Sequence, residues 1–372
     1  MPPVTVMIKP ASGLCNMRCR YCFYADEAAK RETASYGLMS PETLEAVLRR
    51  VLSFAEGECT LAFQGGEPTL AGLPFFQRVV ELGESLNVHR VRLHYAIQTN
   101  GYVLDDDWCA FFARNHFLVG LSLDGPKDLH DRNRLDAQGR GTFQRVMRSA
   151  ALLAKHGADF NILTVVTSET ARHIRSVYQF FARSGFGYQQ YIPCLDPLGE
   201  VRGGHDYSLS PERFGQYLKD LFDCWYRDMA AGRPCYNRYF DNLVGMLMGQ
   251  RPEACGMAGV CGRQYVVEAD GGVYPCDFYM LDAYRLGSFV TDSFEQIEAR
   301  REEIGFLQAS AVVHEDCRRC KWGPLCRGGC RRDRDYGGDV LGKNYYCAAY
   351  RAFFDYAYPR LAALARQMGG GR

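Results

Sequence analysis

Short apolar runs rich in β-branched residues alternate with longer segments of helical period from residue 4 to about residue 195. This alternation is typical of repeated β/α units. Ser40 and Pro41 form a helix start, and the apolar positions behind them share one helical face, which predicts a helix that covers a sheet. Six units of this kind predict an open or partial (β/α)6 barrel of the TIM type, with ligands bound where the loops converge at the C-terminal ends of the strands. The predicted strands are residues 4–9, 59–63, 91–98, 117–123, 159–167 and 187–193.

The pattern changes after residue 195. A polar link leads to a second Ser-Pro helix start, Ser210 and Pro211, and to two helical segments. Residues 255–347 are rich in cysteine and in turns and have little apolar period, so metal must supply much of their folding energy. The terminal glycines are expected to be disordered. The predicted division is a core at 1–195 that extends to about 235, a helical bridge at 236–254, a cysteine-rich domain at 255–347, and a C-terminal helix and tail at 348–372.

Charge and hydropathy narrow the class of protein. The chain has 44 Lys and Arg against 43 Asp and Glu, a balance that offers no field for binding nucleic acid or an anionic membrane. The start MPPVTVMIKP lacks the basic and then apolar regions of a secretory signal, and no stretch reaches the roughly 18 apolar residues of a membrane span. We therefore expect a globular cytoplasmic protein without nucleic-acid or membrane partners.

Sixteen cysteines are far more than a cytoplasmic chain uses for packing. Thiols stay reduced in that compartment, so metal or cluster ligation explains them better than disulfides do. Three cysteines fall within residues 15–22 and eight within residues 255–347. The remaining five, which we interpret as small buried hydrophobic residues, are Cys59, Cys109, Cys194, Cys224 and Cys235.

The first group, Cys15, Cys19 and Cys22, follows the first predicted strand with three and two residues between its members. Three thiolates hold three irons of a cubane cluster and leave the fourth open, whereas a structural zinc ion needs a fourth protein ligand. The stretch CNMRCRYC resembles the radical S-adenosylmethionine superfamily. In that family the open iron chelates the cofactor, and one electron from the cluster cleaves it to a 5′-deoxyadenosyl radical.

The second predicted strand ends in GGEP, an element that binds the cofactor's amino group in that family. Glycine suits a place where the backbone approaches a ligand closely, although the same letters also fit a plain turn. The fourth strand ends in GLSLDGP, where a turn and a solvated charge are equally good interpretations of the polar residues. By the resemblance, the cofactor contacts are Tyr21, Gly65, Gly66, Glu67, Ser122, Asp124, Arg134 and Leu195.

The second group contains eight cysteines, enough to ligate two clusters or two zinc ions. The pair Cys317 and Cys320, with His314 nearby, is also typical of a zinc knuckle. The whole run resembles the SPASM domain, which carries two auxiliary iron–sulfur clusters and so brings the expected total to three [4Fe–4S] clusters. The resemblance assigns Cys255, Cys261, Cys276 and Cys330 to one auxiliary cluster, and Cys317, Cys320, Cys326 and Cys347 to the other. Clusters ligated entirely by cysteine suit electron transfer, which favours a net oxidation.

Among SPASM proteins the chain is most similar to the anaerobic sulfatase-maturating enzymes, through stretches such as IKPASGLCNMRCRYCFY, FQGGEPTLAG and VVEADGGVYPCDFY. These enzymes oxidise a Cys or Ser of a sulfatase peptide, within a Cys/Ser-x-Pro/Ala-x-Arg motif, to formylglycine. Asp277 matches their general base, although it also fits a turn cap that fixes the cluster loop. An electron donor such as flavodoxin or ferredoxin is expected.

Three matters stay open at this point. Related SPASM enzymes form thioether or carbon–carbon crosslinks in ribosomal peptides, and a zinc-binding interaction protein without catalysis uses similar cysteine spacings. The preference for Cys or Ser is not determined by the sequence. Six polar or amphipathic residues near the motifs fit the lining of a peptide groove, and most fit a structural role equally well: Tyr24, Gln64, Gln98, Asn100, Arg238 and Tyr239.

Overall fold

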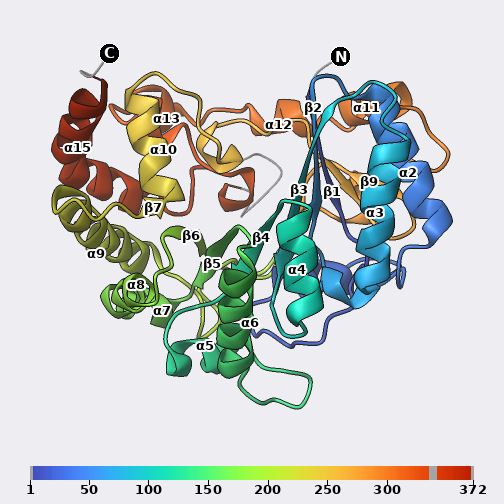
Figure 1. Cartoon of the computed structure of the whole chain (residues 1–372). Coiled ribbons are helices and arrows are strands. Elements are labelled where there is room, and N and C mark those ends of the chain that lie inside the picture. Colours follow the sequence, from blue (N-terminus) through green and yellow to red (C-terminus); the bar gives the residue numbers. More distant parts are fainter. Residues whose placement is uncertain (1–2, 335–341, 370–372) are drawn as a thin grey trace. The chain divides into compact units, whose positions relative to one another are not determined.

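The computed structural model describes residues 3–334 and 342–369 (Figure 1). The chain folds into two compact units, each assembled from segments that are separated in the sequence. The first unit comprises Met1–Leu123, His130–Asn161 and Arg263–Gly305, and the second comprises Asp124–Leu129, Ile162–Gly262 and Phe306–Arg372. The first glycine of the predicted disordered tail, Gly369, instead ends a helix, and residues 370–372 lie outside the described residues.

The first unit is built on a mostly parallel sheet. Strands β1 to β4 pair in parallel in sequence order, and β8 pairs in parallel with the other edge of β1. The short strands β9 and β10 continue this edge in antiparallel pairs. The strands are β1 (Val4–Ile8), β2 (Glu58–Phe63), β3 (Arg92–Thr99), β4 (Phe117–Ser122), β8 (Tyr265–Val267), β9 (Gly272–Tyr274) and β10 (Gly287–Ser288).

Helices cover this sheet. Ser40 caps α2 by accepting the Thr43 N–H at 3.1 Å, and α2 packs on α3 while α4 packs on α6. The predicted apolar face of α2 is fully buried, through Leu44, Val47, Leu48, Val51 and Leu52. The helices are α1 (Phe23–Ala29), α2 (Pro41–Phe54), η1 (Pro68–Ala71), α3 (Leu73–Ser85), α4 (Asp106–Arg114), α6 (Phe143–His156), η3 (Asp282–Tyr284) and α11 (Phe294–Glu303).

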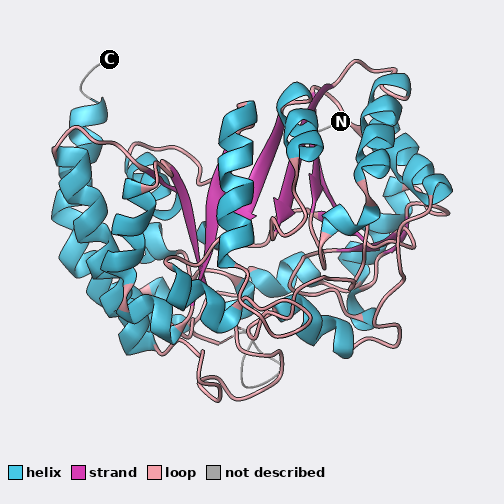
Figure 2. Ribbon diagram, turned by 60° about the horizontal axis from the view of Figure 1, so that its bottom comes forward, coloured by secondary structure: helices cyan, strands magenta, loops and turns pink. Residues whose placement is uncertain are grey.

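The second unit combines parallel strands with a layer of helices. Strand β6 (Tyr188–Pro193) pairs in parallel with β5 on one side and with β7 (Tyr236–Asn237) on the other. Helix α9 packs on α7, α8 and α15, and α10 also packs on α15. Figure 2, coloured by secondary structure, shows strands flanked by helices. The helices are α7 (Ser168–Arg172), α8 (Ile174–Arg183), α9 (Pro211–Ala230), α10 (Arg238–Leu247), η2 (Cys255–Met257), α12 (Phe306–Ser310), α13 (Glu315–Arg318), α14 (Gly323–Cys326), η4 (Arg331–Asp333) and α15 (Cys347–Gly369).

The sequence predictions for the strands and for the long capped helices are confirmed. All six predicted strands are present within about one residue at either end, and β5 (Phe160–Val166) and α5 (Lys127–Asn133) each contain residues of both units. Ser210 caps α9 as predicted, by accepting the Arg213 N–H at 3.2 Å. The mostly parallel α/β architecture is therefore as expected. Among the described residues, no helix combines the length and the apolar character needed to cross a membrane.

Candidate active site

The first cysteine group lies in the loop between β1 and α1. Cys15, Cys19 and Cys22 are half-buried, and none of them forms a disulfide. Burial raises the pKa of the Cys15 thiol to about 11, so its thiolate is disfavoured here unless a positively charged group binds to it. Three free thiols on one short loop fit the donor set of an iron–sulfur cluster.

Two backbone hydrogen bonds hold the GGEP turn against this loop. Gly66 N–H donates to the Ser12 carbonyl and Glu67 N–H to the Leu14 carbonyl, both at 2.8 Å. A Cβ added to Gly66 would lie 2.0 Å from the Leu14 oxygen, and Gly65 has a φ of +131°, so both positions require glycine. The close approach predicted from the sequence is thus an approach to the cysteine loop.

Glu67 is buried and ties the GGEP turn to the end of β3. Its carboxylate accepts hydrogen bonds from the Thr69 N–H at 3.1 Å, from the Thr69 and Thr99 hydroxyls at 2.7 Å, and from the Asn100 N–H at 2.8 Å. Burial nevertheless raises the pKa of the Glu67 carboxyl. Asn100 also donates to Asn16 at 2.8 Å, so β3, the GGEP turn and the cysteine loop form one hydrogen-bonded group.

Three other predicted cofactor residues fall in the same unit. Arg134 is buried with its guanidinium 5.6 Å from the centre of the Tyr21 ring. The backbone of Arg20 donates to the Asn133 carbonyl at 3.1 Å, which fixes this arginine's segment beside the cysteine loop. Ser122 accepts a hydrogen bond from Gln98 at 3.0 Å. The other two, Asp124 and Leu195, belong to the second unit, where Asp124 accepts the Val165 N–H at 3.0 Å.

Asp277 follows β9 and is buried beside Lys9, a pairing that the sequence pattern did not indicate. Lys9, at the end of β1, forms an ion pair with one oxygen of Asp277, and Gln64 donates to the other at 3.1 Å. The Lys9 side chain is fully buried, and its ammonium lies 4.6 Å from the centre of the Tyr24 ring. Both carboxylate oxygens are therefore held in fixed directions.

A second buried ion pair adjoins the first. The Tyr24 hydroxyl is hydrogen-bonded to Glu268, and the Arg31 guanidinium pairs with the same carboxylate at 2.5 Å. Burial and the negative charge of Glu268 raise the pKa of Tyr24 well above its usual value, so this phenol stays protonated. The sequence offered one signal for these residues, namely that Lys9 and Glu268 are charges beside apolar strand runs.

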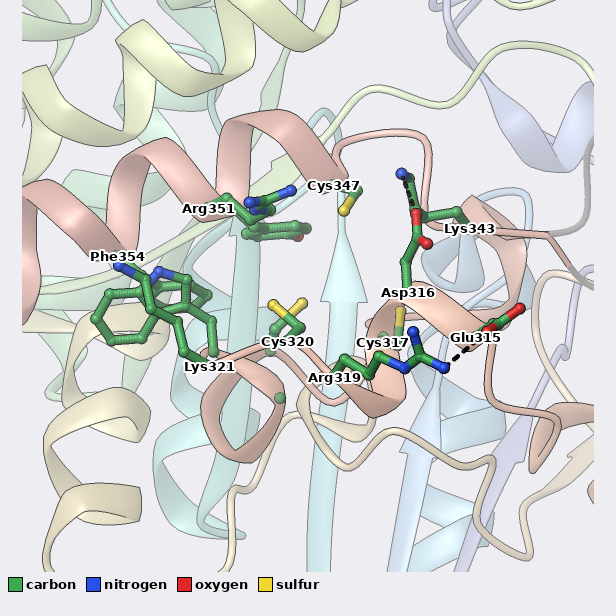
Figure 3. A pocket seen from close by; sticks show the side chains of 15 residues that line it. Glu315, Asp316, Cys317, Arg319, Cys320, Lys321, Lys343, Cys347, Arg351 and Phe354 are labelled. Atoms are coloured by element: carbon green, nitrogen blue, oxygen red, sulfur yellow. Dashed lines mark hydrogen bonds and ion pairs between the residues drawn. The ribbon is translucent and has the colours of Figure 1, made fainter.

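Four cysteines of the second group surround a cavity in the second unit. Cys317, Cys320, Cys326 and Cys347 line a space of about 530 Å³ between α13, α14 and the start of α15 (Figure 3). In the described ranges, no three His, Cys, Asp or Glu side chains meet at a point suited to a single metal ion. Four thiols around a space of this size fit a cluster of several atoms.

The other four cysteines are divided between the two units. Cys255, Cys261 and Cys330 lie in the second unit, and Cys276 lies in the first. Burial raises the pKa of the Cys330 thiol to about 12, and the nearby thiols of Cys255 and Cys261 contribute to this rise. These three thiols are therefore close enough to influence one another electrostatically.

The cysteines outside the two groups are mostly packed in the interior. Cys59, Cys109, Cys194 and Cys224 are buried, which confirms their interpretation, whereas Cys235 is half-buried. Four of the residues expected near a peptide groove lie beside predicted site residues. Gln64 is hydrogen-bonded to Asp277, and the Tyr24 ring contacts Lys9, the ion-pair partner of Asp277. Gln98 is hydrogen-bonded to Ser122, and Asn100 to Glu67. Arg238 and Tyr239 lie in the second unit at the start of α10.

The chain matches known protein families and enzymes over nearly its whole length. The model of the Radical SAM superfamily matches residues 10–181, and that of the SPASM iron–sulfur cluster-binding domain matches residues 255–321. The cysteine-type anaerobic sulfatase-maturating enzyme of Clostridium perfringens strain 13 is 47% identical over 369 residues, which cover 99% of this chain and 100% of the relative. The serine-type enzyme of Bacteroides thetaiotaomicron is 30% identical, covering 98% of this chain and 92% of the relative.

Solved structures agree with these matches. The native enzyme anSMEcpe with bound AdoMet and the Kp18Cys peptide superimposes with a TM-score of 0.95 at 47% identity, covering 98% of this chain and 100% of that one. Streptococcus suis SuiB bound to S-adenosylmethionine reaches a TM-score of 0.61 at 17% identity, covering 91% of this chain and 77% of that one, which shows a shared fold.

Proposed function

The chain belongs to the anaerobic sulfatase-maturating enzymes of the radical S-adenosylmethionine superfamily, and we propose that it oxidises a cysteine in a sulfatase polypeptide to Cα-formylglycine. The observation that carries the proposal is full-length identity of 47% to a cysteine-type enzyme, combined with Asp277 held beside the end of β1, the strand that leads into the cysteine loop. The same full-length match favours this reaction over peptide crosslinking.

The residues present fit the cofactors that this reaction needs. Cys15, Cys19 and Cys22 would hold the cluster that binds S-adenosylmethionine, and the two sets of four SPASM cysteines would hold two more [4Fe–4S] clusters. When bound, the reduced cluster and S-adenosylmethionine supply a 5′-deoxyadenosyl radical, which removes a hydrogen atom from the substrate Cβ. Gly65, Gly66 and Glu67 would orient the cofactor, together with Tyr21, Ser122, Asp124, Arg134 and Leu195.

Asp277 is proposed as the general base. After the hydrogen atom leaves Cβ, oxidation to the thioaldehyde also requires loss of the thiol proton and of one electron. The ion pair to Lys9 and the hydrogen bond from Gln64 hold the carboxylate in place. Water then hydrolyses the thioaldehyde to formylglycine and releases hydrogen sulfide, so the atoms balance.

The clusters that the two sets of SPASM cysteines would hold would supply a route for this electron, since a cluster ligated entirely by cysteine has no open position for a substrate. A flavodoxin or ferredoxin is the proposed electron partner, and the cytoplasm is the proposed compartment because all 16 cysteines are free thiols. The matched ranges 10–181 and 255–321 support the proposed core at 1–195, extending to about 235, and the cysteine-rich domain at 255–347, joined by a bridge at 236–254 and followed by a terminal segment at 348–372.

The test uses three peptides that differ at one position of a Cys-x-Pro-x-Arg motif, with Cys, Ser or Ala. Each is incubated without oxygen with the reconstituted protein, dithionite and S-adenosylmethionine, and aldehyde is captured with a hydrazine and measured by mass spectrometry. We expect aldehyde from the Cys peptide, less from the Ser peptide, and none from the Ala peptide. Cofactor cleavage with all three peptides unmodified would reject formylglycine formation.

A further inference from the structure

A basic surface surrounds the cavity lined by Cys317, Cys320, Cys326 and Cys347. Residues 312–323 and 343–355 contain five Lys and Arg but three Asp and Glu, in a chain whose overall charge is +1. The side chains of Arg319 and Lys321, which flank Cys320, are 84% and 71% exposed. The excess positive charge is therefore concentrated at the mouth of the cavity.

The carboxylates of this surface are already engaged by cations. Asp316 pairs with Lys343 at 2.8 Å and Glu315 with Arg319 at 3.3 Å (Figure 3). Asp355 pairs with Lys321 at 2.6 Å. Arg318 and Arg351 add two further positive charges on the same elements, α13 and α15. Exposed ion pairs of this kind add little to folding stability, so an acidic partner can replace these carboxylates at little cost.

Apolar side chains accompany the charges. Val312 and Val313, directly before α13, are both exposed, and the Trp322 ring contacts Phe354 and Tyr358 at the opposite end of this surface. Protein interfaces combine an aromatic and apolar centre with charged residues around it. Cys317 and Cys320 lie between these groups in the sequence. A protein bound here would therefore be separated from the cysteines by individual surface side chains and not by the interior of the unit.

We propose that this surface, formed by residues 312–322 with Lys343 and Arg351, is the docking site of an acidic one-electron carrier protein, which collects the electron released during substrate oxidation. The proposal rests on the proposed function, because that reaction releases one electron for each thioaldehyde. The four cysteines would hold a cluster that supplies one electron to the oxidised carrier, which would be reduced by one electron with no change of protons or bonds. Positive charge around the cavity steers the acidic carrier and speeds its association.

The test compares two double variants with the same change in charge. Arg319→Glu/Lys321→Glu reverses the proposed surface. Arg49→Glu/Lys155→Glu is the control, because Arg49 pairs with Glu45 at i,i+4 as Arg319 does with Glu315, and Lys155 pairs with Asp106 as Lys321 does with Asp355. Both control side chains are 63% exposed, in the first unit. Iron and sulfide contents of all proteins show whether the clusters assemble equally.

Each protein is reduced, freed of reductant and mixed with oxidised flavodoxin, and the semiquinone is followed by stopped flow. We expect the second-order rate constant of Arg319→Glu/Lys321→Glu to fall about tenfold or more at low salt, and the control to stay within about twofold of the unaltered protein. Raising the salt should slow the unaltered protein but speed the reversed variant, because salt screens attraction in the first and repulsion in the second. Oxidation by a small neutral quinone should be equal in all three.

Equal flavodoxin rates in both double variants would overturn the docking site. So would a loss of rate towards the quinone that matches the loss towards flavodoxin, since that pattern reports damage to the cluster. Aldehyde formation driven by dithionite is measured alongside. Aldehyde from the unaltered protein with equal flavodoxin rates rejects the docking site alone, whereas absence of aldehyde rejects the proposed reaction.

Discussion

At the scale of single residues, Lys9 determines the environment of Asp277. A fully buried ammonium needs an opposite charge close by, and Asp277 supplies it while the Tyr24 ring contributes a cation–π contact. Breaking such a pair from one side leaves an uncompensated buried charge, which costs about 3–5 kcal/mol of folding stability. The pair therefore fixes the direction from which the carboxylate can accept a proton.

Substitution of Asp277 separates the radical step from the proton transfer. Asp277→Asn should still cleave S-adenosylmethionine to 5′-deoxyadenosine, while aldehyde formation falls about 100-fold or more, because the amide cannot accept the thiol proton. Both products are measured by liquid chromatography and mass spectrometry in the same reaction. Asp270→Asn, which removes another ion-paired carboxylate of the first unit, should keep both products. Unchanged aldehyde from Asp277→Asn would exclude Asp277 as the base.

At the scale of elements, the site depends on how the ends of neighbouring parallel strands are joined. The GGEP turn after β2 is hydrogen-bonded to the loop after β1, and Glu67 connects the same turn to the end of β3. Parallel strands bring these three ends to one edge of the sheet, where ligands bind. The cysteine loop is therefore positioned by backbone contacts before any cofactor binds.

Gly66 is the position where this arrangement is most sensitive to added volume. Gly66→Ala would place its Cβ 2.0 Å from the Leu14 carbonyl oxygen and force the turn away from the cysteine loop. We expect S-adenosylmethionine to bind the reconstituted variant about tenfold or more weakly, because a small displacement spoils a preorganised site. Equilibrium dialysis measures the affinity. Gly187→Ala is the control, since a Cβ there meets nothing within 4 Å, and it should bind as the unaltered protein does. Equal binding by Gly66→Ala would contradict the role assigned to this glycine.

At the scale of the whole molecule, local patterns predicted more than distant contacts. The six strands and the caps at Ser40 and Ser210 follow from periodicity and from side chains a few residues apart. The Lys9–Asp277 pair joins residues 268 positions apart, and no local signal specifies it. The short strands β9 and β10 have three and two residues, too few to show a period of two.

The cysteine-rich segment illustrates the same limit. Its residues Arg263–Gly305 pack in the first unit, through the parallel pairing of β8 with β1, while Phe306 and later residues belong to the second unit. Cysteine spacing does not reveal which part of this segment pairs with which sheet. The two cysteine groups could be predicted from spacing. That Cys276 lies in a different unit from Cys255, Cys261 and Cys330 could be seen only in the folded structure.

The most direct measurement of the central claim uses a Cys-x-Pro-x-Arg peptide with deuterium at both Cβ positions of the cysteine. The reconstituted protein, S-adenosylmethionine and dithionite are incubated with it without oxygen, and 5′-deoxyadenosine and the peptide are analysed by mass spectrometry. The proposed reaction predicts one deuterium transferred to each 5′-deoxyadenosine formed during turnover, and one formylglycine that keeps the second deuterium. Aldehyde formed without deuterium in 5′-deoxyadenosine, or deuterium transfer that leaves no aldehyde, would contradict it.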